Sequence, residues 1–149
     1  MSTEEEPIER RVGEALSTTG ATVALAESCT GGLIASLLTD VPGASEYVDR
    51  SLVAYAYDAH RTLLGVSRET LDTHGTVSEA SANQMARAAR DGADTTWGLA
   101  ATGVLGPGGG TPQNPSGRPS SPLPTPASGN RAPPGRALHA TRSMATDGR

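Results

Sequence analysis

The chain has 149 residues, one cysteine, no lysine and a formal net charge of −4. This length suits one domain with a single core. No apolar stretch approaches the roughly twenty residues of a membrane span, and the acidic first residues differ from a signal peptide. The protein is therefore predicted to be soluble and cytoplasmic. A lone Cys29 and three scattered histidines predict neither an intramolecular disulfide nor a metal site.

The charge is divided unevenly along the chain. Residues 1–115 hold fifteen Asp and Glu against seven Arg, whereas residues 116–149 hold five Arg against one acidic residue. The acidic first part lacks the basic surface of a nucleic-acid-binding domain. Neither nucleic acid nor a membrane is therefore predicted as a partner.

Helices and strands are predicted to alternate from the N-terminus. A capping-box pattern, Thr3 with Glu6, places Pro7 in the first turn of a helix. The apolar run 22–26 then suits a buried strand, and a second helix is predicted to open near Thr30. These features predict a helix, a strand and a helix in that order.

The alternation continues through the rest of the first part. Predicted in order are a strand at 51–55, short helices at 58–64 and 68–74, a helix capped by Ser78, and a strand at 97–101. The inward face of the capped helix is expected to hold Ala82, Met85, Ala86 and Ala89. Strands separated by helices imply a layered α/β domain.

Residues 116–149 differ from everything before them. They hold six of the eleven prolines, and they show no apolar periodicity. Such a segment cannot hold a core and is predicted to be a disordered tail. The alternative is a frameshift, because a shifted reading of codons 116–127 permits an apolar strand. We favour the frameshift, since a tail of this composition has no packing reason to follow the Gly-rich loop. The nucleotide sequence of codons 112–130 decides between the two.

The most informative segment is Ala26–Gly32, which reads Ala-Glu-Ser-Cys-Thr-Gly-Gly. It lies where a strand gives way to a helix, and its two glycines leave room for a ligand. The first turn of a helix presents unpaired N–H groups and the positive end of a dipole. The segment therefore predicts an anion-binding loop.

This segment resembles the signature of the CinA C-terminal domain family, the nicotinamide mononucleotide deamidases. Six blocks match in order over about ninety residues, which is far more specific than one Gly-rich loop. They are Ala26–Gly32, Thr39–Ser45, Val53–Ala59, Leu64–Val66, His74–Glu79 and Thr102–Pro112. The resemblance implies a three-layer α/β/α fold around a mixed sheet, in an incomplete domain at 1–115 that lacks its C-terminal strands and helix.

The resemblance also implies the activity: hydrolysis of nicotinamide mononucleotide to nicotinate mononucleotide and ammonia, in pyridine nucleotide salvage. It places a serine nucleophile at Ser45 and the catalytic segment at Tyr55 to His60, where the family has a lysine base in place of His60. A neutral imidazole can accept the serine proton, although its reach is shorter than that of lysine. The alternative is a catalytically inactive, truncated nucleotide-binding module.

The substrate nucleotide is expected between two loops that each follow a strand, at the edge where α/β sheets bind ligands. The residues predicted to bind it are Ser28, Cys29, Thr30, Gly31, Gly32, Thr102, Gly103, Gly106, Gly108 and Gly109. No cofactor is expected, because water is the second substrate. The resemblance further suggests self-association into a homo-oligomer.

Each catalytic candidate has a simpler structural explanation. Ser45 follows Pro42-Gly43 and is typical of a turn, and His60 is typical of an exposed helix residue. Tyr55 is typical of a strand core position. Cys29 could be the nucleophile, but free cysteines are more often small buried hydrophobes.

Overall fold

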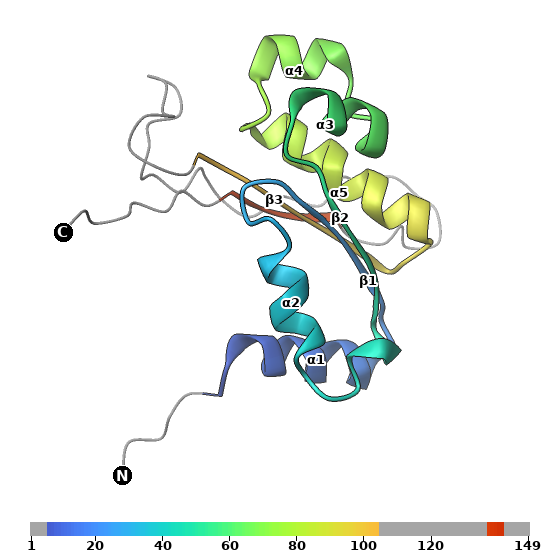
Figure 1. The fold of residues 1–149 in the computed structure, drawn as a ribbon. Coiled ribbons are helices and arrows are strands. Elements are labelled where there is room, and N and C mark those ends of the chain that lie inside the picture. The colour runs from blue at the N-terminus through green and yellow to red at the C-terminus, as the bar shows by residue number, and fades with distance from the viewer. Residues whose placement is uncertain (1–5, 105–136, 142–149) are drawn as a thin grey trace, which may run out of the picture.

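The computed structural model describes residues 6–104 and 137–141 of the chain. Strands and helices alternate through most of this part, and all of the strands join one sheet (Figure 1). In chain order the elements are α1 Ile8–Thr19, β1 Val23–Glu27, α2 Leu33–Thr39, the 3₁₀ turn η1 Ala44–Glu46, β2 Val48–Val53, α3 Tyr57–Leu64, α4 Arg68–His74, α5 Glu79–Ala93, β3 Trp97–Thr102 and β4 Ala137–Thr141.

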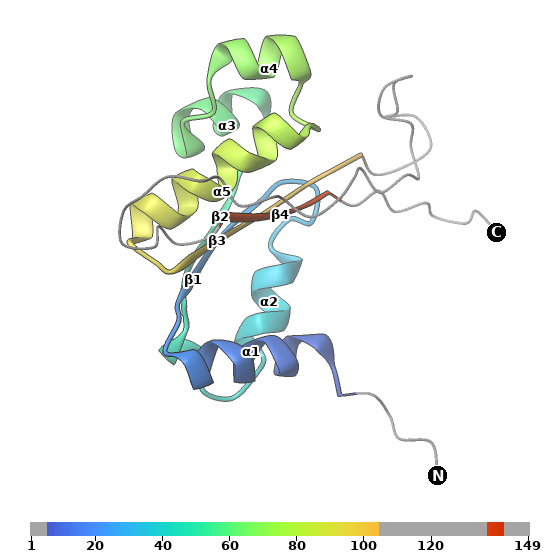
Figure 2. The same ribbon diagram turned by 180° about the vertical axis from the view of Figure 1, so that it is seen from behind.

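The sheet has the order β2-β1-β3-β4, and every described pairing is parallel. Helices α1 and α2 lie on one face of the sheet, and α3, α4 and α5 lie on the other, as the two opposite views agree (Figures 1 and 2). The predicted three-layer α/β/α fold is confirmed. The described strands are those of a parallel sheet, whereas the resemblance implied a mixed one.

Two hydrophobic clusters fill the space between the layers. The cluster under α5 contains Ala24 and Ala26 of β1 and Ala100 of β3, and the cluster beside α1 contains Val23 and Leu16. Successive residues of β1 therefore face opposite layers, as a strand buried on both faces requires. The four residues predicted to face inward from α5 are all fully buried: Ala82, Met85, Ala86 and Ala89.

Helices α1 and α2 begin at other residues than the sequence predicted. Helix α1 begins at Ile8 with Pro7 at its N-cap, and the expected cap Thr3 lies outside the described residues. Helix α2 begins at Leu33, because Gly31 and Gly32 both have left-handed backbone angles that extend the preceding loop. The Ser78 cap is confirmed, since the hydroxyl of Ser78 accepts a hydrogen bond of 3.1 Å from the N–H of Ser81.

The segment 116–149 was expected to add no packed structure, but residues 137–141 form β4 alongside β3. Strand β3 is therefore paired on both sides and is not the sheet edge that a domain ending at 115 would leave. Backbone pairing needs no particular side chain, and 137–141 contains none of the prolines that precede it. The segment 105–136, including the region where a frameshifted strand was considered, lies outside the described residues. Among the described helices, none is long and apolar enough to cross a membrane.

Candidate functional site

The loop from Ser28 to Gly32 connects the carboxyl end of β1 to α2. The N–H of Ser28 donates to the carbonyl of Ala101 at 2.8 Å, so the β1–β3 ladder extends one residue into the loop. The carbonyl of Ser28 accepts from the N–H of Gly31 at 3.1 Å. The predicted junction of strand and helix is confirmed, and it lies at the carboxyl edge of the sheet, where parallel α/β sheets bind ligands.

The first turn of α2 does not offer free N–H groups to a ligand. Its donors are the N–H groups of Ile34 and Ala35, which donate to the two carboxylate oxygens of Glu27 at 2.9 and 3.0 Å. Glu27 is fully buried. The carboxylate of the protein therefore occupies the positive end of this helix dipole, and binding of a substrate anion by the loop from Ser28 to Gly32 stays a prediction.

Cys29 is half-buried beside this carboxylate. Burial raises the pKa of its thiol, and the charge of Glu27 raises it further, against an opposing effect of the backbone N–H groups of Cys29 and Thr30. A raised pKa disfavours the thiolate, which is the nucleophilic form of cysteine. The simpler interpretation of Cys29 as an unreactive thiol is therefore favoured.

His60 is fully buried on α3, contrary to its interpretation as an exposed helix residue. Its Nδ1 lies 2.8 Å from the carbonyl oxygen of Ala56. Because a carbonyl can only accept, Nδ1 carries a proton; in the neutral form of the ring Nε2 is then the acceptor. Nε2 is buried and has no hydrogen-bond partner in the described part of the chain. An acceptor of this kind is suited to take a proton from a nucleophile.

Ser28 and His60 share one edge and one face of the sheet. Both follow the carboxyl end of a strand, Ser28 after β1 and His60 after β2. Leu64, one turn after His60, packs into the cluster under α5 together with Ala26. Strand β1 ends at Glu27, and its alternation, continued by one residue along the Ser28–Ala101 hydrogen bond, predicts that Ser28 is on the same face as Ala26. Ser28 is also buried, with 7% of its surface exposed.

Ser45 lies at the other end of β2. It belongs to η1, which precedes this strand, whereas α3 follows it. A strand of six residues spans about 16 Å. The structure therefore does not bring Ser45 and His60 together. In Figures 1 and 2, α1 and α2 lie at the bottom and α3 at the top.

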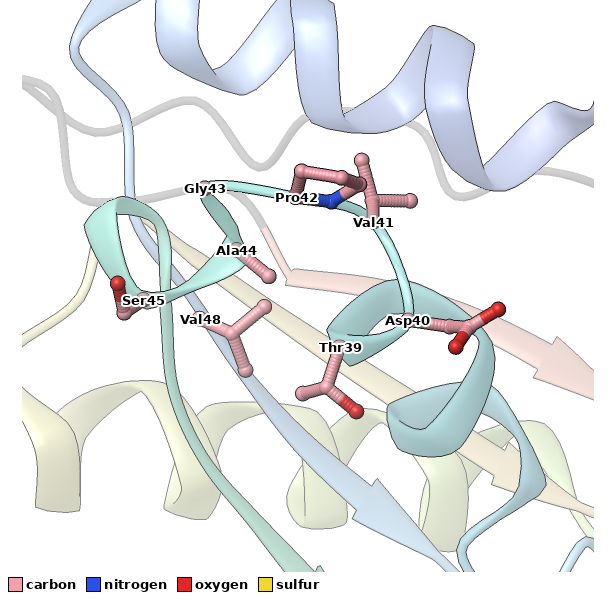
Figure 3. A pocket seen from close by; sticks show the side chains of 8 residues that line it. All are labelled: Thr39, Asp40, Val41, Pro42, Gly43, Ala44, Ser45 and Val48. Atoms are coloured by element: carbon pink, nitrogen blue, oxygen red, sulfur yellow. The ribbon is translucent and has the colours of Figure 1, made fainter.

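The surroundings of Ser45 form an open pocket of about 440 Å³. In Figure 3, Ser45 lies across this pocket from Thr39 and Asp40. Among the described residues that line the pocket, Asp40 is the one acidic side chain. The full lining is Thr39, Asp40, Val41, Pro42, Gly43, Ala44, Ser45 and Val48.

The remaining predicted site residues fall into three groups. Tyr55 is 71% exposed at the carboxyl edge, so its interpretation as a core residue is wrong. Thr102 is fully buried, and its hydroxyl donates to the carbonyl of Thr76 at 2.8 Å, which ties β3 to the segment before α5. Gly103 is half-buried directly after this strand. The other glycines of this loop lie outside the described residues: Gly106, Gly108 and Gly109.

Comparison with known proteins shows the family of the chain. The family described as the CinA C-terminal domain matches residues 5–119. The chain belongs to this family. A CinA-like protein of Desulforapulum autotrophicum is 52% identical over 110 residues, which are 74% of this chain and 26% of that protein. A CinA-like protein of Gloeobacter violaceus is 54% identical over 99 residues, 66% of this chain and 23% of that protein.

Solved structures of the CinA family share the fold. The competence/damage inducible protein CihA of Agrobacterium tumefaciens is 46% identical with a TM-score of 0.71, over 78% of this chain and 73% of that one. The competence damage-inducible protein A of Klebsiella pneumoniae is 34% identical with a TM-score of 0.71, over 74% and 68%. This CinA C-terminal domain spans about a quarter of the length of the curated relatives.

Sequence reasoning missed Glu27 in this CinA domain. In a sequence, an acidic residue at the end of an apolar run is typical of a solvent-exposed strand end. The available signal was its place one residue before Ser28 and six before the helix start, which brings it under the first turn once the loop closes.

Proposed function

We propose that this chain is an amidohydrolase that cleaves the carboxamide of nicotinamide mononucleotide to the carboxylate and ammonia. The observation that supports it is the buried ring of His60, whose Nδ1 is engaged by the Ala56 carbonyl while Nε2 is left as an acceptor. This hydrogen bond selects the tautomer of the neutral ring in which Nε2 is the acceptor, and an acceptor nitrogen is what a general base needs.

We propose Ser28 as the nucleophile in place of Ser45. Ser28 is on the same edge and face of the sheet as His60, whereas Ser45 is separated from His60 by the length of β2. Cys29 is a weaker candidate, because its raised pKa keeps the thiol protonated. Tyr55 is exposed at the same edge and is proposed to contact the substrate.

The reaction proceeds in two halves. The hydroxyl of Ser28 attacks the carboxamide carbon, and its proton passes to Nε2 of His60. The protonated ring returns that proton to the leaving nitrogen, so ammonia departs and an ester remains on Ser28. Water then attacks the ester with the same ring as base, which releases the acid and restores the hydroxyl. The Ala56 carbonyl keeps the ring oriented in both halves.

The test is release of ammonia from nicotinamide mononucleotide by the purified chain. Ser28→Ala and His60→Gln are expected to lower turnover by about a hundredfold or more, the usual scale for a positioned base or nucleophile. Ser45→Ala is expected to retain activity, and Cys29→Ala to weaken binding at most. Circular dichroism and thermal unfolding of each variant separate loss of chemistry from loss of fold.

Each contrary outcome has a distinct meaning. Loss of turnover in Ser45→Ala but not in Ser28→Ala would show that Ser45 is the nucleophile. Loss in Cys29→Ala alone would make the thiol the nucleophile. If the parent chain binds the nucleotide in a calorimeter but releases no ammonia, the chain is an inactive nucleotide-binding module and the proposal fails.

A further inference from the structure

The carboxylate of Glu27 connects three segments at the carboxyl edge. Its Oε1 accepts from the hydroxyl of Thr30 at 2.7 Å and from the N–H of Ile34 at 2.9 Å. Its Oε2 accepts from the N–H of Ala35 at 3.0 Å and from the hydroxyl of Ser51 at 3.1 Å. One oxygen therefore holds the loop and α2, and the other holds α2 and β2.

All four partners of Glu27 are neutral donors. An ionised carboxylate has only acceptor sites, so four donors match this form. Hydrogen bonds to a charged acceptor are about twice as strong as neutral ones, and the positive end of α2 adds to them. These interactions offset the cost of burying the charge.

The backbone of this loop needs stabilising contacts from other segments, because its two glycines leave it flexible. Gly31 and Gly32 have φ angles of 60° and 102°, and neither glycine restricts its own backbone. The backbone of Ser28 is held on one side by β3, through Ala101. The bond from Thr30 to Glu27 closes the other side of the loop, two residues beyond Ser28.

From this arrangement we infer that Glu27 is a positioning residue, which fixes the loop so that the hydroxyl of Ser28 meets the substrate carboxamide. The inference rests on the proposed amidohydrolase function. Glu27 itself contacts no reacting atom, because its oxygens are directed to the loop, α2 and β2. A displacement of about 1 Å in a reacting group can lower the rate by about a hundredfold.

Two single substitutions provide a matched test, because each removes one hydroxyl donor from the same carboxylate. Thr30→Val removes the bond to the loop, and Ser51→Ala removes the bond to β2. Thr30→Val is expected to lower kcat about tenfold or more while KM changes less than about threefold. Ser51→Ala is expected to keep kcat within about twofold, and Thr30→Ser to restore the parent kcat. Equal kcat values for Thr30→Val and Ser51→Ala would overturn the inference.

Glu27→Gln tests the carboxylate directly. Its amide nitrogen cannot accept from Ala35, so kcat is expected to fall about a hundredfold. The charge also lies beside Cys29, so the pH profile of Cys29 alkylation by iodoacetamide is expected to move to lower pH in Glu27→Gln and to stay in place in Ser51→Ala. An unmoved alkylation profile would contradict a charged Glu27 beside the loop. If Glu27→Gln does not fold, Thr30→Val still decides the question.

Amide hydrogen exchange separates this inference from the proposed function. Residues 29–32 are expected to exchange faster in Thr30→Val than in Ser51→Ala, whether or not the chain releases ammonia. If the parent releases none, the proposed function fails, and exchange alone decides whether Glu27 holds the loop. Unchanged exchange in Thr30→Val would overturn the inference even in an active enzyme.

Discussion

Gly98 of β3 lies directly against α5, and substituting alanine there tests the packing of this helix on the sheet. A Cβ at Gly98 would lie 2.0 Å from the carbonyl oxygen of Ala86 and 2.8 Å from Cβ of Arg90. Ordinary contacts of a Cβ begin near 3.4 Å. The backbone oxygen cannot rotate away as a side chain could, so α5 has to move by about 1 Å or more from the sheet.

The expected cost follows from this displacement. Overpacking a core usually costs about 1–3 kcal/mol, and a clash with backbone belongs at the upper end. For a folded part of about 100 residues, about 3 kcal/mol lowers the melting temperature by about 10–20 °C. The movement also disturbs Thr102, whose hydroxyl ties the end of β3 to the segment before α5.

The assay is urea unfolding followed by circular dichroism, with Gly92→Ala in α5 as a control. Gly92 is exposed in α5, and a Cβ there meets nothing within 4 Å. Alanine in place of an exposed helical glycine is expected to raise the free energy of unfolding by about 0.5–1 kcal/mol. A Gly98→Ala protein as stable as the parent would refute this packing of α5 on β3.

Four further outcomes are expected from the described contacts. The buried hydroxyl of Tyr47 has no partner in the described part of the chain, so Tyr47→Phe should leave the free energy of unfolding unchanged or raise it by up to about 1 kcal/mol in urea titrations. A decrease of more than about 1 kcal/mol would show that the hydroxyl has a hydrogen-bond partner. Burial raises the pKa of Tyr47, and the hydrogen bond to Asp72 raises the pKa of Tyr57, so the tyrosines of the unfolded chain ionise first and the free energy of unfolding should fall as pH rises above about 10. Tyr47→Phe should make this fall less steep. A free energy of unfolding that rises with pH in the parent would contradict the prediction. Ser78→Ala removes the α5 cap and should cost about 1 kcal/mol in thermal unfolding, whereas no loss would mean that another group satisfies the helix end. Deletion of 137–149 removes β4 from β3, and light scattering should then detect a larger assembly than that of the parent chain, formed through the exposed edge, while an assembly of unchanged size would argue against that pairing.

The family and the layered fold could be predicted from the sequence because both depend on local signals. Apolar runs identified β1 and β3, and the spacing of Ala82, Met85 and Ala89 identified the buried face of α5. These features repeat with the period of the backbone itself, so they need no knowledge of distant residues. The cap at Ser78 is local for the same reason.

The site could be predicted only in part. The loop after β1 was placed correctly at a strand-to-helix junction, and the place of His60 in the family motif made it a candidate that stays a prediction. The pairing of Ser45 with His60 was not supported, because closeness in sequence does not tell which end of a strand a residue occupies. Fifteen positions separate the two, and the length of β2 lies between them.

By itself the sequence determined the alternation of helices and strands, the inward face of α5 and membership of the CinA family. Tertiary structure decided that Glu27 fills the first turn of α2, that Nε2 of His60 is buried without a described partner, and that β4 pairs with β3. The reason is physical: periodicity and caps act within a few residues, whereas a buried carboxylate, an orphaned ring nitrogen and a sheet order exist only after segments far apart in the chain have packed together.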